Sequence, residues 1–204
     1  MSGEAVVHVI DDDKAVRRSI AFLLAASDIP ARIYESAQGF LDVLEPDAAG
    51  CVLCDVRMPG MDGIELLQAL RARGIAMPFV VMTGHADVAM AVRAMKGGAM
   101  DFIEKPFEEG ALLAVLSKGL EQGTADSERA RRKGALGERL RRLTPRERQV
   151  LERIAAGKPN KIIAHELGLS PRTVEVHRAN LMDKMEARNA SDLVAIFLEA
   201  DGRG

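Results

Sequence analysis

Carboxylate side chains follow two apolar segments in the first half of the chain. Asp11, Asp12 and Asp13 come directly after the apolar run 6–10, and Asp55 closes a second apolar run. Several carboxylates in one crevice would repel each other unless a cation shared the site. Mg²⁺ suits oxygen-only ligands, with waters and one phosphate completing its shell. The pattern therefore predicts a Mg²⁺ site that also accepts a phosphate.

Short apolar runs alternate with amphipathic stretches through this half. The runs predict strands at Val6–Ile10, Ala31–Tyr34, Cys51–Asp55, Phe79–Thr83 and Phe102–Glu104. The stretches predict helices at Ala15–Ala26, Ala37–Leu44, Gly63–Ala72, Asp87–Met95 and from Glu108 to about Leu120. This alternation indicates an α/β domain, with a five-stranded parallel sheet covered by helices on both faces.

The predicted sheet brings polar side chains to one edge. In a doubly wound, flavodoxin-like sheet of strand order 2-1-3-4-5, ligands bind at the carboxyl ends of the strands where the order reverses. Asp55 and the acidic run 11–13 flank that reversal, Thr83 ends the fourth strand, and Lys105 follows the fifth. A carboxylate, a hydroxyl and an ammonium beside Mg²⁺ predict a phosphoryl-transfer site in which Asp55 becomes an acyl phosphate.

Four motifs resemble the receiver domain of two-component response regulators. They are VIDDD at 9–13, CDVRMPGMDG at 54–63, MTGH at 82–85 and EKPF at 104–107. The resemblance covers residues 5–122 and is greatest to FixJ-type regulators. Ala86 and Ala89 stand where many FixJ-like sequences have Gly and Pro.

The resemblance implies a role for each residue that would bind metal or phosphate. Asp55 is implied to be the phosphoacceptor. Asp12, Asp55 and the Arg57 backbone carbonyl are implied to hold Mg²⁺, with Asp11 assisting through a water. Asp13 fits a helix cap as well as a metal contact.

The resemblance also implies a switch. Thr83 and Lys105 would contact the phosphate, and the Lys105–Pro106 bond is expected to be cis. Phe102 matches the aromatic position that turns inward as Thr83 moves. The helix from Asp87 and the strand before Lys105 would form the dimerisation face, whereas His85 has no implied role.

The charge of the chain changes sign along its length. Residues 1–128 carry 11 Lys and Arg against 20 Asp and Glu, whereas residues 129–204 carry 17 against 10. A basic second half indicates contact with nucleic acid phosphates. Between the halves, the glycine-containing charged stretch 123–137 is predicted to be a linker, with its helicity left open.

Beyond the linker, helix start and stop signals predict a small all-α domain. Thr144 and Glu147 form a capping box around Pro145. The predicted N-caps are Thr144, Asn160, Ser170 and Ser191, and the predicted helix ends are Gly157, Gly168 and Met185. A tight turn between the second and third helices indicates a helix-turn-helix.

The third helix of this domain has two different faces. Val174, His177, Leu181 and Met185 form the predicted core face, so His177 is interpreted as a packed histidine rather than a metal ligand. The opposite face mixes charged and small apolar residues, which suits a major groove. The residues predicted to contact DNA are Asn160, Lys161, Arg172, Thr173, Glu175, Val176, Arg178 and Ala179.

The segments LTPRER at 143–148 and SPRTVEVHR at 170–178 resemble the LuxR/NarL-type helix-turn-helix over residues 138–202. Such domains bind inverted repeats in double-stranded promoter DNA as dimers, often through the last helix. The two resemblances imply a transcription factor whose receiver is phosphorylated by a sensor histidine kinase and then forms a homodimer. RNA polymerase is a further candidate partner, and no enzymatic activity on an external substrate is expected.

Two other functions fit parts of the sequence. Asp11-x-Asp13 matches the nucleophile pattern of haloacid dehalogenase-like phosphatases, but the second acidic pair and the specificity cap of those enzymes are missing. A receiver whose helical tail binds protein or RNA explains the basic charge less well than DNA binding does. The sequence contains no Walker motif, so an ATP-driven activator is not expected.

The remaining features predict a cytoplasmic protein. No apolar run approaches the length of a membrane span, and the N-terminus lacks a basic signal region. Cys51 and Cys54 could form a redox pair or half a zinc site, but their apolar run favours a buried strand with reduced thiols.

Overall fold

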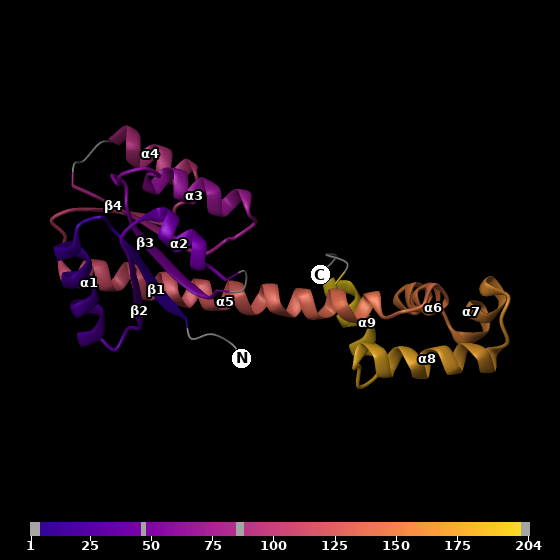
Figure 1. The fold of residues 1–204 in the computed structure, drawn as a ribbon. Coiled ribbons are helices and arrows are strands. Elements are labelled where there is room, and N and C mark those ends of the chain that lie inside the picture. Colours follow the sequence, from indigo (N-terminus) through magenta and orange to yellow (C-terminus); the bar gives the residue numbers. More distant parts are fainter. Residues whose placement is uncertain (1–4, 46–47, 85–87, 201–204) are drawn as a thin grey trace. The chain divides into compact units, whose positions relative to one another are not determined.

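The computed structural model describes residues 5–45, 48–84 and 88–200. Its strands are β1 Val6–Ile10, β2 Ala31–Tyr34, β3 Gly50–Asp55, β4 Phe79–Thr83 and β5 Asp101–Glu104. They form a five-stranded parallel sheet of order β2-β1-β3-β4-β5 (Figure 1). The predicted fold class and strand order are confirmed.

Helices cover both faces of the sheet (Figure 1). They are α1 Lys14–Ala26, α2 Ala37–Val43, α3 Gly63–Ala72, α4 Val88–Lys96 and α5 Glu109–Arg141. Two core clusters show the layering: one joins the sheet to α1 and α5, and the other joins it to α2, α3 and α4. Asp87, at the predicted start of α4, lies outside the described residues, as do His85 and Ala86, whereas Ala89 lies in α4.

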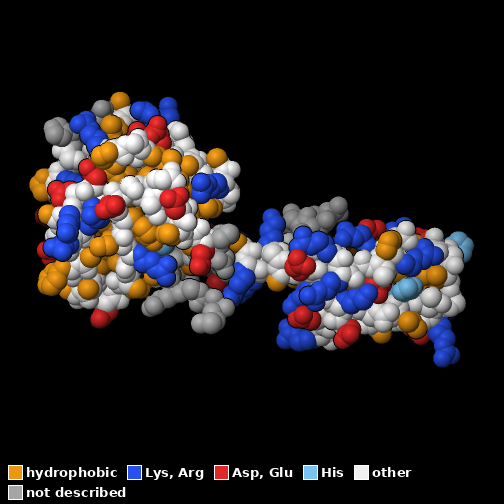
Figure 2. Space-filling model, in the orientation of Figure 1, with side chains coloured by type: hydrophobic (Ala, Val, Ile, Leu, Met, Phe, Trp, Pro, Cys, Tyr) orange, Lys and Arg blue, Asp and Glu red, His pale blue; other side chains and the backbone are white. Residues whose placement is uncertain are grey.

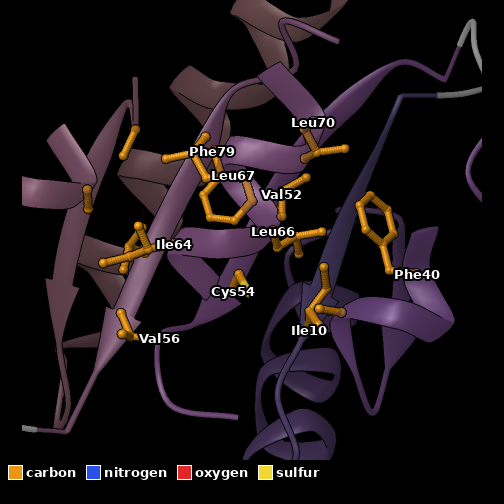
Figure 3. Close-up of a cluster of buried hydrophobic side chains, with 14 of the residues drawn as sticks. Ile10, Phe40, Val52, Cys54, Val56, Ile64, Leu66, Leu67, Leu70 and Phe79 are labelled. Carbon is orange, nitrogen blue, oxygen red and sulfur yellow. The ribbon is translucent and has the colours of Figure 1, made fainter. Parts of the chain in front are cut away.

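The cluster on the α2–α4 side fills the space between the helices and the central strands (Figure 3). Side chains of β1 and β3 alternate between the two faces, because successive residues of a strand point in opposite directions. Figure 3 labels Ile10, Phe40, Val52, Cys54, Val56, Ile64, Leu66, Leu67, Leu70 and Phe79 in this cluster. This core fixes the carboxyl ends of β1 and β3, where the predicted site lies.

The two cysteines are buried, unpaired thiols in β3. Cys51 packs on the α1–α5 side and Cys54 on the opposite side, since residues three apart in a strand point to different faces. Burial raises the pKa of Cys51 to about 12. The structure agrees with the buried-strand interpretation.

The helix α5 is much longer than predicted. It was expected to end near Leu120, but it continues to Arg141 through the segment predicted as a linker. The segment contains no proline and is rich in Glu, Lys, Arg and Ala, which favour helix and outweigh its glycines. The chain divides into two compact units, Met1–Glu128 and Arg129–Gly204, and the division falls within this helix.

The second unit contains α6 Pro145–Ala155, α7 Asn160–Leu167, α8 Pro171–Met185 and α9 Ala190–Ala200. Its core includes Leu143, Val150, Leu151, Ile154, Ile163, Ala164, Val174, Leu181, Met185 and Leu193. The capping box of Thr144 with Glu147 and the Ser170 cap are confirmed. Gly168 ends α7 in the left-handed conformation that favours glycine.

Two predicted caps are wrong. Pro159 occupies the N-cap of α7, so Asn160 is already the first helical residue, and its side chain accepts a hydrogen bond from Arg178 instead. Asn189, not Ser191, caps α9, because its Oδ1 lies 2.9 Å from the backbone N of Asp192, three residues ahead. None of the described helices is long and apolar enough to cross a membrane.

Candidate functional site

Parallel pairing of β1 with β3 places Asp11 beside Asp55. Ile10 is paired with Cys54, and an aspartate follows each of them. Ligand oxygens of Asp11, Asp12 and Asp55 lie within 4.8 Å of one another. Asp11 is fully buried, and Asp12 is exposed. The three predicted metal-binding carboxylates therefore share one site at the carboxyl edge of the sheet.

The Lys105 ammonium joins two of these carboxylates. Its Nζ lies 2.6 Å from Oδ2 of Asp11 and 3.2 Å from Oδ2 of Asp55. Burial acts to lower the pKa of Lys105, but the hydrogen bonds and charges of the two aspartates outweigh it and raise the pKa. Lys105 therefore stays cationic at neutral pH, and the Lys105–Pro106 bond that follows it is cis, as predicted.

Asp55 combines limited exposure with several polar neighbours. Its side chain is 14% exposed, and burial raises its pKa more than the Lys105 charge and the Arg57 backbone hydrogen bond lower it. Three carboxylates and one ammonium leave two net negative charges in the cluster. The donor atoms are all oxygens, so the residues fit Mg²⁺ in both charge and ligand type.

The structure places Thr83 and Phe102 on neighbouring strands. Thr83 is buried at the end of β4, and its backbone carbonyl accepts a hydrogen bond from the Lys105 amide, with N and O 2.7 Å apart. Phe102 lies on β5 opposite Val81 and packs, half buried, against the α2–α4 core. Thr83 is therefore held next to Lys105, while Phe102 lies two residues further back along the sheet.

Asp13 caps α1 in this structure. Its Oδ1 accepts a hydrogen bond from the backbone N of Ala15 at 2.7 Å and a longer one from Val16. The neighbouring Asp11 accepts one from the Asp13 amide at 2.8 Å, so the acidic run forms a local turn around the site. Of the two functions open for Asp13, the structure shows the cap.

Two residues of the site were not predicted from the sequence. Arg17 donates from Nη1 to the backbone carbonyl of Asp11 at 2.6 Å, so it holds the backbone that carries this carboxylate. Gly63 packs against the backbone of Asp55 and donates to the Val56 carbonyl. Gly63 directly follows Asp62, a residue type that caps helices, so its place at the start of a helix after the Asp55 strand could have been predicted. Nothing in the local sequence indicates the contact of Arg17.

The predicted DNA-contacting face of α8 is exposed. Arg172, Glu175, Val176 and Ala179 are all exposed, whereas Val174, Leu181 and Met185 are buried, as the helical periodicity predicts. Val176 is 54% exposed although it is apolar. An apolar side chain between charged ones on an open face suits contact with base edges.

Other predicted contact residues interact within the unit. Arg178 donates from Nη1 to Oδ1 of Asn160 at 3.3 Å, which links α8 to the start of α7. The Thr173 hydroxyl hydrogen bonds with Ser170, whereas Lys161 is exposed. His177 is half buried, and its Nδ1 is buried without a hydrogen-bond partner among the described residues, in keeping with a packed ring.

Comparison with known families covers both units. Residues 7–117 match the response regulator receiver domain, and residues 141–197 match the bacterial regulatory proteins of the luxR family. The chain is 50% identical over 194 residues to the transcriptional regulatory protein FixJ of Azorhizobium caulinodans, covering 95% of this chain and 92% of the relative. It is 46% identical to FixJ of Bradyrhizobium diazoefficiens, with 98% of each chain covered.

Two solved structures with similar folds align with nearly the whole chain. The response regulator StyR aligns with a TM-score of 0.88 at 40% identity, covering 96% of this chain and 98% of that one. Full-length FixJ from B. japonicum aligns with a TM-score of 0.58 at 45% identity, with 98% of each chain covered. Both alignments extend over the receiver-like and the helical units.

Proposed function

The chain belongs to the FixJ-type response regulators, DNA-binding transcription factors of two-component systems, and from this premise we propose that phosphorylation of Asp55 controls its binding to DNA. A sensor histidine kinase supplies the phosphoryl group. The receiver then forms a homodimer, and the helix-turn-helix binds an inverted repeat in double-stranded promoter DNA. RNA polymerase is the further partner expected of an activator bound at a promoter.

The proposed transfer uses groups that lie together in the site. A carboxylate oxygen of Asp55 attacks the phosphorus of the kinase phosphohistidine, and the P–N bond breaks. The histidine imidazole is the leaving group, and Asp55 becomes an acyl phosphate. Lys105, 3.2 Å from Asp55, balances charge on the phosphoryl oxygens. The Thr83 hydroxyl donates to one of those oxygens, and its movement lets Phe102 turn inward.

We also propose that Mg²⁺ belongs to this site. Asp12, Asp55 and the Arg57 backbone carbonyl would hold the ion, with Asp11 assisting through a water. Bound there, the ion would neutralise negative charge on the phosphoryl group. The support is the pair of uncompensated negative charges that three carboxylates leave beside the single Lys105 ammonium.

The proposed domain boundaries are 5–122 for the receiver, 123–137 for the connection and 138–202 for the DNA-binding domain. The family matches at 7–117 and 141–197 support them, although the connection is helical rather than irregular. Activity on an external substrate is not part of the proposal. DNA contacts are assigned to the exposed face of α8, with Asn160 and Lys161 near the phosphates.

The observation that carries this proposal is the Lys105 ammonium held between Asp11 and Asp55. Of the two aspartates that contact this ammonium, Asp55 is partly exposed and Asp11 is fully buried. Asp55 is therefore the more accessible phosphoacceptor of the two. A phosphatase of the haloacid dehalogenase type would instead use Asp11.

The test is intact-mass measurement after incubation with acetyl phosphate and Mg²⁺, followed by reduction of the acyl phosphate with borohydride and peptide mapping. We expect one phosphoryl group on Asp55 in the wild type, one in Asp13→Asn, and none in Asp55→Asn. A phosphoryl group on Asp11 would overturn the assignment.

A further inference from the structure

The positive charge of the second unit is unevenly distributed. Residues 129–142, the last part of α5 and the residue that follows it, carry seven Lys and Arg against one Glu. Residues 143–204, which hold α6 to α9, carry ten against nine. Nearly all the net positive charge of this unit therefore lies in the helix that leads into the helix-turn-helix. We call residues 129–142 the basic α5 segment.

Four of the nine Lys and Arg residues between 143 and 200 pair with neighbouring carboxylates. The ion pairs there include Lys184 with Glu147, Arg153 and Lys158 with Glu166, and Arg188 with Asp192. In the basic α5 segment, Arg131, Arg132 and Lys133 are all exposed, and none forms an ion pair with the described residues. These three charges are therefore available to an external anion.

The basic α5 segment is attached to the unit that carries α8. Leu140 packs against the core of this unit, and the Leu140 carbonyl accepts a hydrogen bond from Arg148. Arg139 donates from Nη1 to the carbonyl of Met185, the last residue of α8, at 3.2 Å. At about 1.5 Å per residue, Lys133 lies only about 9 Å along the helix from Arg139. The position of the basic α5 segment is thus tied to that of α8. Figure 2 shows Lys and Arg side chains, with Asp and Glu among them, over the helical unit.

We propose that the basic α5 segment is a second DNA contact, one that binds the phosphates flanking the base pairs read by α8. The inference rests on the proposed DNA-binding function and names the source of most of its electrostatic affinity. DNA phosphates release condensed counterions when Lys or Arg neutralises them, which gives affinity without sequence preference. The segment sets affinity, and the exposed face of α8 sets specificity.

The test compares two full-length triple variants with the wild type, each measured with and without Mg²⁺ and beryllofluoride. The first is Arg131→Gln with Arg132→Gln and Lys133→Gln, in which Gln preserves helix propensity. The matched control is Arg18→Gln with Arg73→Gln and Lys118→Gln, which removes three exposed charges from the receiver. The probes are a random-sequence duplex and a duplex that the wild type selects from a random library. Circular dichroism and light scattering check helix content and dimerisation.

We expect the first variant to bind both duplexes at least tenfold more weakly at 0.1 M salt. Each lost phosphate contact reduces the slope of log K against log salt by about 0.9, so the slope falls by up to about 2.7. The preference for the selected duplex stays unchanged, as does all binding by the control.

Three results would overturn the inference. They are an unchanged salt slope, an equal loss of affinity in the control, and tighter binding by the unphosphorylated triple variant. The last result would mean that the segment contacts the acidic receiver instead. If the wild type selects no duplex from the library and does not bind the random-sequence duplex, the proposed DNA-binding function itself is refuted, so the failures of the two proposals are distinguishable.

Discussion

A Cβ atom added to Gly63 would lie 2.4 Å from the backbone carbonyl oxygen of Asp55. Gly63 begins α3, and its amide donates to the carbonyl of Val56 at 3.0 Å, directly after the strand that carries Asp55. The first turn of α3 therefore rests on the backbone of the proposed phosphoacceptor. Only a residue without a side chain permits this approach.

Substituting Gly63→Ala is expected to destabilise the receiver by about 1–3 kcal/mol, because the added methyl meets backbone atoms that cannot rotate away. Phosphorylation by acetyl phosphate should slow as the end of β3 shifts. Urea denaturation and intact-mass kinetics measure the two effects. Gly134→Ala, at an exposed position of α5 with open space around it, should instead stabilise the helix by up to about 1 kcal/mol. Wild-type stability and kinetics in Gly63→Ala would contradict the role assigned to this glycine.

The sheet and most of the site could be predicted because their signals are local. Apolar runs fix the strands, and parallel pairing then brings the residues after each strand to one edge, so Asp11 and Asp55 could be placed together from spacing alone. The Arg17 contact could not be predicted, because it depends on the direction of a long side chain on α1. The burial difference between Asp11 and Asp12, adjacent in sequence, also arises only in the folded structure.

Neighbouring aspartates give a sharp test of the metal site. Mg²⁺ is expected to raise the melting temperature of the wild type, since a ligand at 100 times its Kd stabilises the folded state by about 2.7 kcal/mol. In Asp12→Asn this Mg²⁺-dependent shift should be lost or strongly reduced, because a proposed ligand is removed. Asp13→Asn changes the charge equally but keeps a good helix cap, so it should retain the shift. Equal Mg²⁺ responses in the two variants would refute the ligand assignment.

The buried His8 makes stability depend on pH. Burial, with a smaller contribution from the Arg32 charge, lowers the pKa of His8 from 6.5 to about 4. Between pH 6.5 and 4 the unfolded chain binds a proton at His8 that the folded chain excludes. The contribution of neutral His8 to the free energy of unfolding is therefore fully present above pH 6.5 and is lost as the pH falls toward 4. The loss is on the order of 3 kcal/mol.

Urea denaturation from pH 7 to 4 compares wild type with His8→Leu, in which this part of the pH dependence should disappear. His165→Gln, which changes an exposed histidine of α7, should keep it. If the unfolding free energies of wild type and His8→Leu fall in parallel across the window, His8 is not the group responsible.

Glu175 on the exposed face of α8 is expected to read a base. Glu175→Gln should reduce preference for the selected duplex at one base position by about 1–3 kcal/mol, because a carboxylate that accepts from cytosine is lost. The salt slope should not fall, since no phosphate contact is removed. Binding to a panel of single-base variants of the selected duplex measures the preference. The comparison variant Asp183→Asn, two turns further along the same exposed stripe, is expected to leave it unchanged. An unaltered preference in Glu175→Gln would exclude this contact.

The helical unit shows where sequence signals compete. The Thr144 capping box was recognisable because both partners lie three residues apart, and the structure confirms it. Asn160 and Asn189 are both residues that can cap a helix. Because Pro159 occupies the N-cap of α7, Asn160 lies in the first helical position, and its side-chain oxygen accepts a hydrogen bond from Arg178 instead. The long α5 was missed because glycines weaken a helix only modestly, and a helix that is already formed can propagate through them.

We propose that phosphorylation of Asp55 is the switch that turns this chain into a dimer. The most direct measurement is solution mass by light scattering, with and without Mg²⁺ and beryllofluoride, in wild type and in Asp55→Asn. We expect the wild type to change from monomer to dimer when both are added, whereas Asp55→Asn remains a monomer. A wild-type mass that does not change, or an Asp55→Asn variant that dimerises equally well, would contradict it.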